Sequence, residues 1–452
     1  MSANSPAYNA FHFPARLNDE PAPRSLVLRT AWPWWIHPAW AVALLPALTA
    51  LIAVIIPASA YSDWKTQKYL TNEYSLWLLV LLLTLLLGII LSSAMAMRGG
   101  STLITFSPTQ ITFLKRAYRT LFILTAVGYL VWIGSAISQG ATFQDLSQVL
   151  ERSPGAISEL KAISAPIGGI TTLTQFGIVA VPLGAILHKI GVTKNYHYLI
   201  VLLAGIRTVF YAERLALIET ILPLFLIVAL TTTRRSKLNF LVKITPIVAP
   251  LLVWGFFAVS EYSRSWIFYQ YTTPLPFANW VSMRLLGYYV TAYNNSALLA
   301  TYLPGASHVP YFTFEGFWNF PGISNLGPPK ISAVSPDDWW FSVLSHHGNP
   351  ELNNTGSFLV TLGELGATGA IVFWLIIGII VGAVFVRMTK GGVIGMLAVA
   401  SLFVGLLELP RFTYWTLGRC FPVLIALIIL ALTYPRVREG DKPQRRAESP
   451  PG

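Results

Sequence analysis

Long apolar segments, separated by short polar connections, run along almost the whole chain. Their apolar residues are continuous rather than alternating, which favours membrane-crossing helices of about 20 residues over β-barrel strands. The hydropathy pattern predicts ten such segments: 37–58, 75–97, 120–137, 167–187, 198–209, 215–230, 240–260, 357–386, 393–409 and 420–434. We therefore expect an all-α polytopic membrane protein with about ten transmembrane helices.

The fifth and sixth predicted spans are too short to cross a bilayer alone. They flank a turn that carries Arg207, Glu213 and Arg214. Lipid offers no partner to a charge or to a free backbone group, so a charged turn at this depth must be buried in protein or line a cavity.

Composition supports the membrane assignment and narrows the function classes. Hydrophobic residues make up 54% of the chain and charged residues 11%, against roughly 25% charged residues in soluble domains. Mean hydropathy is +0.59. A disordered chain and a soluble enzyme are excluded, because too few polar side chains remain to cover a globular surface. Cys420 is the only cysteine, so the chain can form no disulfide within itself.

The basic residues predict an orientation rather than a nucleic-acid partner. The net charge is +12, but the basic side chains are dispersed among short loops. With both termini in the cytoplasm, 20 of the 31 lie on the cytoplasmic side, as the positive-inside rule expects. This divides the chain into a cytoplasmic tail (1–36), a transmembrane domain (37–435) with a large outer loop (261–356), and a polar cytoplasmic tail (436–452). The outer loop is rich in aromatic residues, and we expect short helices near 280–303 and 336–345.

Arginines are the most informative candidates for chemistry. Six are predicted at the outer ends of spans or in the outer loops: Arg207, Arg214, Arg264, Arg284, Arg411 and Arg419. The planar guanidinium matches phosphate oxygens and stays charged when buried, so the set indicates an anionic ligand such as a lipid-linked diphosphate. The alternative is internal pairing, for example Glu261 with Arg264 and Glu408 with Arg411 at helical i,i+3 spacing.

Other candidate residues give weaker signals. His346 and His347 precede Glu351 but lack a second ligand cluster, so a hydrogen-bonding role is favoured over a metal. Trp339 and Trp340 follow two aspartates and could stack on sugar rings, or simply belong to a helix start. Asp63 in the first outer loop has the position of a catalytic aspartate in metal-dependent lipid-linked glycosyltransferases, although a solvated loop residue is the simpler interpretation. No Walker-type loop or dinucleotide fingerprint is present.

Several motifs in the latter half, over 198–434, carry a family resemblance. They are Arg214-Leu215-Ala216-Leu217-Ile218; Asn354-Thr355-Gly356-Ser357; Gly363-Glu364-Leu365-Gly366-Ala367-Thr368-Gly369; Leu409-Pro410-Arg411; Arg419; and the outer-loop residues Trp318, Pro321, Gly322, Pro328 and Pro329. With the large loop after the seventh span, they resemble the Wzy-type oligosaccharide repeat-unit polymerases of O-antigen, capsule and common-antigen assembly. The first 190 residues match only in hydropathy.

The resemblance implies a fold similar to GT-C glycosyltransferases and a reaction in the bacterial inner membrane. Such enzymes move a growing glycan from undecaprenyl diphosphate onto an incoming undecaprenyl-diphosphate-linked repeat unit, with a chain-length regulator and a flippase as further partners. No cofactor or metal is expected, since arginines can meet the charge of the leaving diphosphate.

The resemblance assigns roles to particular side chains without identifying one general base. We assign catalysis to Arg214, Arg411, Glu408, His346 and His347, and substrate binding to Arg207, Arg264, Arg284, Arg419, Lys330, Trp339 and Trp340, with Glu213 as a further candidate base. Two alternatives stay open. A glycan ligase differs only in its acceptor, whereas a transporter would need related halves and charges near the bilayer midplane.

The first testable prediction concerns orientation. Cysteines introduced at Arg116, Arg235 and Arg438 should be shielded from an impermeant thiol reagent in intact cells, and those at Lys161, Arg284 and Lys330 should be labelled. Permeabilised cells provide the control, because every accessible position should then react. Labelling of position 235 in intact cells would contradict the orientation.

Overall fold

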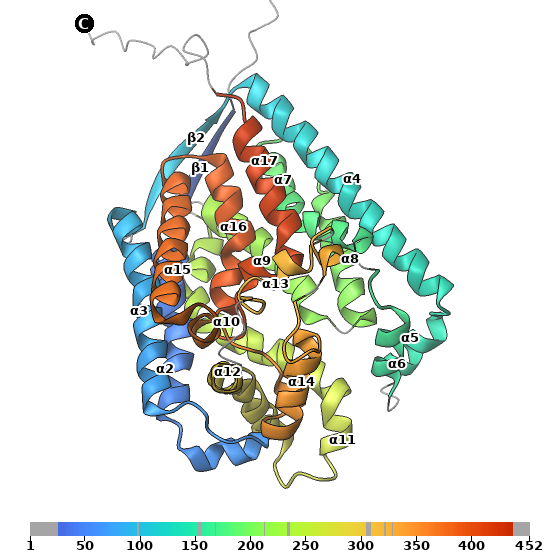
Figure 1. The fold of residues 1–452 in the computed structure, drawn as a ribbon. Helices are drawn as coiled ribbons and strands as arrows, with labels where there is room; N and C mark the ends of the chain where they lie inside the picture. The colour runs from blue at the N-terminus through green and yellow to red at the C-terminus, as the bar shows by residue number, and fades with distance from the viewer. Residues whose placement is uncertain are drawn as a thin grey trace, which may run out of the picture.

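The computed structural model describes residues 26–436, except 97–98, 152–154, 168, 212, 233–235, 304–308, 321 and 328. Arg235, Arg438, Pro321, Pro328 and most of the polar C-terminal tail lie outside the described residues. The described part is almost entirely helical (Figure 1). Its α-helices are α1 (Pro38–Val42), α2 (Leu48–Ile55), α3 (Asn72–Ser93), α4 (Pro108–Ser138), α5 (Phe143–Leu150), α6 (Ala156–Ile163), α7 (Gly177–Lys189), α8 (His197–Phe210), α9 (Arg214–Thr231), α10 (Leu238–Glu261), α11 (Ile267–Tyr269), α12 (Phe277–Tyr302), α13 (Glu315–Trp318), α14 (Pro336–His347), α15 (Phe358–Thr389), α16 (Val393–Glu408) and α17 (Phe421–Thr433).

The apolar segments form helices in the predicted order, which confirms an all-α, multi-pass membrane protein. Within the described residues, seven helical segments are long and apolar enough to cross a membrane: Pro38–Ile55, Asn72–Ala96, Pro108–Ser138, Ile170–Lys189, Arg214–Thr231, Leu238–Glu261 and Phe358–Thr389. Three shorter apolar helices are His197–Phe210, Val393–Glu408 and Gly418–Thr433. Helix α4 begins twelve residues before its predicted span, because Ser107 and Gln110 form a capping box at its start.

A two-stranded ribbon departs from the all-helical expectation; its first strand lies in the predicted N-terminal tail and its second lies between the second and third predicted spans. Strand β1 (Leu26–Trp32) pairs antiparallel with β2 (Gly100–Phe106), from Leu26 opposite Phe106 to Trp32 opposite Gly100. Seven-residue strands are too short to stand out in a search for 20-residue apolar runs. The ribbon lies at the same end of the molecule as the C-terminal end of α17 (Figure 1), where Gln110 Nε2 donates to the carbonyl of Pro435 at 3.0 Å.

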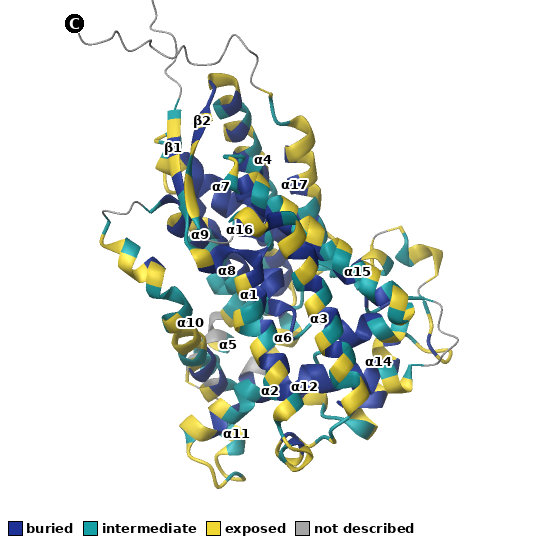
Figure 2. Cartoon of the chain, turned by 90° about the vertical axis from the view of Figure 1, so that its left-hand side faces the viewer, coloured by how far each residue is buried: buried dark blue, intermediate teal, exposed yellow. Residues whose placement is uncertain are grey.

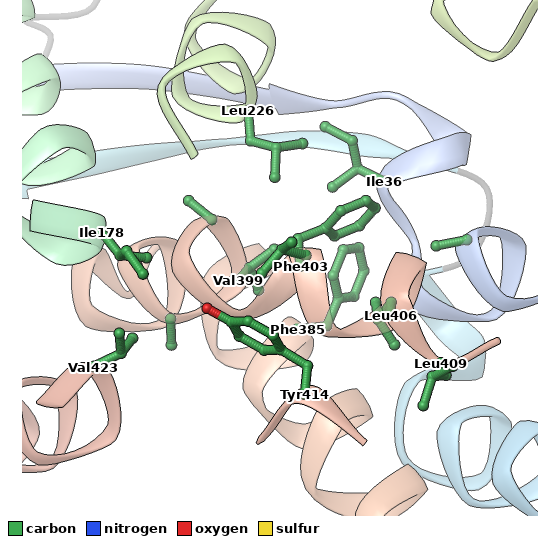
Figure 3. Packing of buried hydrophobic residues seen from close by; sticks show 14 of the residues in the cluster. Ile36, Ile178, Leu226, Phe385, Val399, Phe403, Leu406, Leu409, Tyr414 and Val423 are labelled. Atoms are coloured by element: carbon green, nitrogen blue, oxygen red, sulfur yellow. The ribbon is translucent and has the colours of Figure 1, made fainter. Parts of the chain in front are cut away.

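The core forms where helices approach closely enough to exclude large side chains. Gly88 of α3 faces the backbone of α15 at Leu375 and Gly378, so a Cβ at Gly88 would lie 2.5 Å from the Leu375 carbonyl oxygen. Phe385, Phe403 and Tyr414 then fill the centre of the adjoining cluster (Figure 3). Exposed residues lie mainly on the outer faces of the bundle (Figure 2), as expected where those faces meet lipid.

The predicted outer loop contains a helix that enters the core. Helix α12 is seen nearly end-on in Figure 1, whereas α15 and α16 run along the vertical of the picture, so α12 lies across the bundle. Its Tyr293 hydroxyl donates to the Pro46 carbonyl at 2.8 Å, and the Asn294 and Asn295 side chains are buried and bond to backbone groups. The predicted helices near 280–303 and 336–345 are confirmed as α12 and α14.

Candidate functional site

A large cavity lies between the helix ends that are farthest from the ribbon. Its volume is about 910 Å³, and its walls come from α9, α10, α12, the segment 350–354, the end of α16 and the segment 411–419 that precedes α17. Six basic side chains line it: Lys161, Arg214, Arg264, Arg284, Arg411 and Arg419. Three acidic side chains do so as well: Glu213, Glu351 and Glu408. This excess of positive charge favours an anionic ligand.

The charged turn between α8 and α9 forms one wall as a chain of ion pairs. Arg207 donates to Thr174 Oγ1 at 2.8 Å and pairs with Glu213 at 2.9 Å, but it does not line the cavity. Arg419 reaches Glu213 at 2.6 Å and the buried Glu219 at 2.7 Å. The prediction that this turn is buried in protein or lines a cavity is therefore confirmed. Glu213 and Arg214 line the cavity, and the buried Arg207 holds Glu213 in place through their ion pair.

Glu261 lies behind the cavity wall that α9, α10 and α12 form. Its side chain is completely buried, and three arginines from three elements surround it. Arg214 of α9 lies 2.8 Å away, Arg284 of α12 2.7 Å, and Arg264, in the turn after α10, 3.6 Å. Arg284 also pairs with Glu351 at 3.0 Å. A buried carboxylate without these partners would carry a desolvation penalty of several kcal/mol.

The third wall joins two motifs that are far apart in the sequence. Gly356 has φ +69° and donates its N–H to the Arg411 carbonyl at 2.8 Å, while Ser357 Oγ donates to Leu409 at 2.7 Å. A Cβ at Gly356 would lie 2.7 Å from the Ala292 carbonyl, so glycine is required there. These bonds hold Arg411 against the end of α16, where it pairs with Glu408 at 2.8 Å.

Helix α15, which follows the 354–357 motif, is broken near its start. Gly366, with φ 68° and ψ 175°, interrupts α15. Just before the break, the Glu364 carboxylate accepts the backbone N–H groups of Phe312 and Thr313 at 2.8 and 2.6 Å. The glycine-rich motif 363–369 therefore anchors the loop before α13 to the start of a long helix.

Glu408 differs from the other acids at the cavity. Both carboxylate oxygens of Glu213 and of Glu351 have a charged or hydroxyl partner. Glu408 Oε2 accepts from Arg411, whereas Oε1 has no hydrogen-bond partner among the described residues. Glu408 therefore keeps one oxygen for a ligand.

Tyr289 is a lining residue that sequence reasoning did not single out. It projects from α12, and burial, with the negative charge of Glu408 adding to it, raises the pKa of its hydroxyl to about 12. The phenol therefore stays protonated at neutral pH and can donate a hydrogen bond. Only a tertiary contact between α12 and the end of α16 could have identified it.

Local charges set the protonation of the two acids at the rim. Burial alone would raise the pKa of Glu213, but the charges of Arg419 and Arg207 hold it below its ordinary value. The pKa of Glu351 is likewise lowered, because hydrogen bonds from Tyr269 and Arg284 outweigh its burial. Both acids are therefore carboxylates at neutral pH, occupied in ion pairs.

Four of the predicted site residues, all in α14, lie away from this cavity. Trp339 and Trp340 of α14 pack in a buried apolar cluster with Leu298 and Leu344, so they are core residues rather than an open stacking surface. Their neighbours in α14 bond locally: His346 contacts the Ser342 carbonyl at 2.7 Å, and His347 stacks on Tyr302 at 4.3 Å. The reason in each case is that α14 packs beside α12, outside the cavity.

Lys330 and Asp63 are exposed and do not line the cavity. By contrast, Arg214, Arg264, Arg284, Glu408, Arg411 and Arg419 all meet there. The described residues contain no group of three or more His, Cys, Asp or Glu side chains placed to hold a metal ion. Internal ion pairing, the alternative interpretation of the arginines, is also present at both predicted i,i+3 pairs.

Compared with known protein families, curated sequences and solved structures, the chain matches none of them.

The second testable prediction follows from Glu261. Glu261→Ala should lower the free energy of unfolding by about 3–5 kcal/mol, because it leaves several arginine charges buried without their partner. Thermal unfolding of the detergent-solubilised protein measures this. Glu73→Ala, at an exposed position in the first turn of α3, is the control and should shift stability far less. Equal stability of the two variants would contradict the central role of Glu261.

Proposed function

We propose that this chain is a glycosyltransferase that polymerises undecaprenyl-diphosphate-linked oligosaccharide repeat units at the periplasmic face of the bacterial inner membrane. One observation carries the proposal. An arginine-rich cavity, built largely from the ends of membrane helices, is lined by Glu408, whose Oε1 accepts no hydrogen bond from the described residues. Positive charge for a phosphate-bearing leaving group and a base for an acceptor hydroxyl are the two requirements of this transfer.

The donor diphosphate would lie against Arg214 and Arg411. Both line the cavity, and each already pairs with one carboxylate, which fixes its orientation before substrate arrives. When the bond between the anomeric carbon and the diphosphate oxygen breaks, negative charge grows on that oxygen. Prearranged guanidinium groups stabilise this charge without reorganising at the moment of reaction. The scheme uses no metal or other cofactor.

Glu408 would accept the proton of the acceptor hydroxyl. The hydroxyl oxygen forms the new bond to the anomeric carbon, the diphosphate departs with the bonding electrons, and the proton passes to Glu408 Oε1. Glu213 and Glu351 are less suited to this role. Both oxygens of Glu213 lie in ion pairs, with Arg207 and Arg419, and those of Glu351 contact Arg284 and the Tyr269 hydroxyl. Tyr289, which stays protonated, can donate to a sugar oxygen nearby.

The wider context of the proposal follows the resemblance. A GT-C-like fold, the outer position of the cavity, both termini in the cytoplasm, and cooperation with a flippase and a chain-length regulator belong to the same hypothesis. The ribbon and the end of α17 lie together at the end opposite the cavity, as this orientation requires.

The third testable prediction concerns the two arginines. Arg214→Ala and Arg411→Ala should each lower turnover at least about tenfold, since a charge-assisted hydrogen bond contributes roughly 1.5–3 kcal/mol. Lysine at either position should restore activity only in part, because it lacks the planar fork of donors. Reconstituted protein supplied with lipid-linked repeat units, with product lengths resolved on a gel, provides the assay. Near-native activity in both alanine variants at normal membrane abundance would refute the donor site.

The fourth testable prediction concerns the base. Glu408→Gln keeps the shape of the side chain and should reduce turnover by about 10²–10⁴-fold while changing KM little. The loss should lie in turnover rather than in substrate binding, because the amide keeps the size of the side chain but cannot accept a proton from the acceptor hydroxyl. Glu73→Gln is the exposed control. Near-native turnover of Glu408→Gln at normal membrane abundance would assign the base elsewhere.

A further inference from the structure

Helices α9 and α10 follow each other in the chain and are bridged near both ends. At the end near the ribbon, Trp35 stacks on Phe225 of α9 with ring centroids 6.1 Å apart, and its Nε1 donates to the Val242 carbonyl of α10 at 2.8 Å. At the cavity end, Arg214 of α9 pairs with Glu261 and lies 4.7 Å over the ring of Phe257. Trp35 and Arg214 therefore hold the two helices from opposite ends.

Between these bridges α10 has little protein contact. The buried residues of α10 are Val242, Phe257, Ala258 and Glu261, all of which lie near its ends. Leu251 and Val253, from the middle of the helix, are 69% and 47% exposed. A helix whose middle remains uncovered in a membrane protein presents that surface to apolar chains.

The uncovered stretch is continuous with the charged cavity. Leu215 and Ile218 of α9 and Val253 and Phe256 of α10 belong to the cavity lining, next to Arg214. The cavity wall thus changes from guanidinium groups to aliphatic and aromatic side chains within about one helical turn of Arg214. Such a boundary fits a ligand that has an anionic end and a long apolar end.

We propose that the space between α9 and α10 binds the isoprenoid chain of a polyisoprenyl diphosphate and is its lateral entrance to the cavity. The diphosphate lies at Arg214, and the chain leaves between Ile218 and Val253 toward the bilayer. The inference rests on the proposed function only for the identity of the lipid. A water-soluble sugar nucleotide would leave these apolar side chains without a partner.

Photocrosslinking tests the location directly. Benzoylphenylalanine is introduced at Ile218 or Val253 in the full-length protein, which is reconstituted in phosphatidylethanolamine and phosphatidylglycerol vesicles with radiolabelled undecaprenyl diphosphate. The matched control is Ile428 of α17, a 57%-exposed position on a bilayer-facing helix. Capture at 218 and 253 should exceed capture at 428 about tenfold, and Arg214→Ala should remove the excess by releasing the charged end.

Capture at 218 and 253 no greater than at 428, or an excess that survives Arg214→Ala, would overturn the inference. Unlabelled phosphatidylglycerol added in excess should not compete, and effective competition would overturn the assignment to a diphosphate lipid. The proposed transferase activity is judged separately. Specific capture without sugar transfer would support this binding site and refute the polymerase. Sugar transfer without specific capture would support the polymerase and refute this binding site.

Discussion

The burial of Glu261 is the constraint on which the site depends. A carboxylate with no exposed surface at the end of a membrane helix is tolerated only with close counter-charges, and here Arg214, Arg264 and Arg284 supply them. Because these arginines come from α9, from the turn after α10 and from α12, one buried charge fixes the relative positions of three elements. The cavity has its shape because these elements must converge on that carboxylate.

Charge pairing also explains how several arginines can lie close together at the cavity despite their mutual repulsion and the cost of burying them. Glu213 and Glu219 pair with Arg419, Glu408 pairs with Arg411, and Glu261 pairs with the other three, so each arginine that lines the cavity has a carboxylate partner. The acids are nevertheless outnumbered at the cavity surface. The cavity therefore has a net positive potential from arginines that ion pairs already hold in position, and Glu408 Oε1 has no hydrogen-bond partner among the described residues. The proposed chemistry rests on these two features.

Small residues and helix breaks allow the charged elements to meet. Gly88 lets α3 and α15 approach to backbone contact, and Gly356 brings the start of α15 against both α12 and Arg411. Helix α12 crosses the bundle between these contacts and carries Arg284 and Tyr289 to the cavity. The same geometry keeps α14 outside, which is why its tryptophans and histidines serve packing and local hydrogen bonds.

The sequence by itself determined the membrane class, the order of the ten apolar segments and the buried charged turn between 207 and 214. Apolar runs and charge are local properties, and the cost of exposing either in the wrong solvent is large enough to be decisive. The six arginines could also be identified, since a charged side chain near a membrane span is costly to bury and usually has a function. Seven-residue strands, the length of α4 and the penetration of α12 were missed, because pairing, capping and packing involve partners that hydropathy does not contain.

Tertiary structure alone decided which candidates act together. Nothing along the chain distinguishes Glu408, with its free oxygen, from Glu213, whose oxygens are both paired, and nothing separates the cavity-lining Arg284 from Trp339, which is equally part of the predicted outer loop. The Gly356 N–H donates to the Arg411 carbonyl and the Ser357 hydroxyl to the Leu409 carbonyl, each across more than fifty residues. A site of this kind depends on distances between side chains from separate helices, and those distances exist only once the helices have packed.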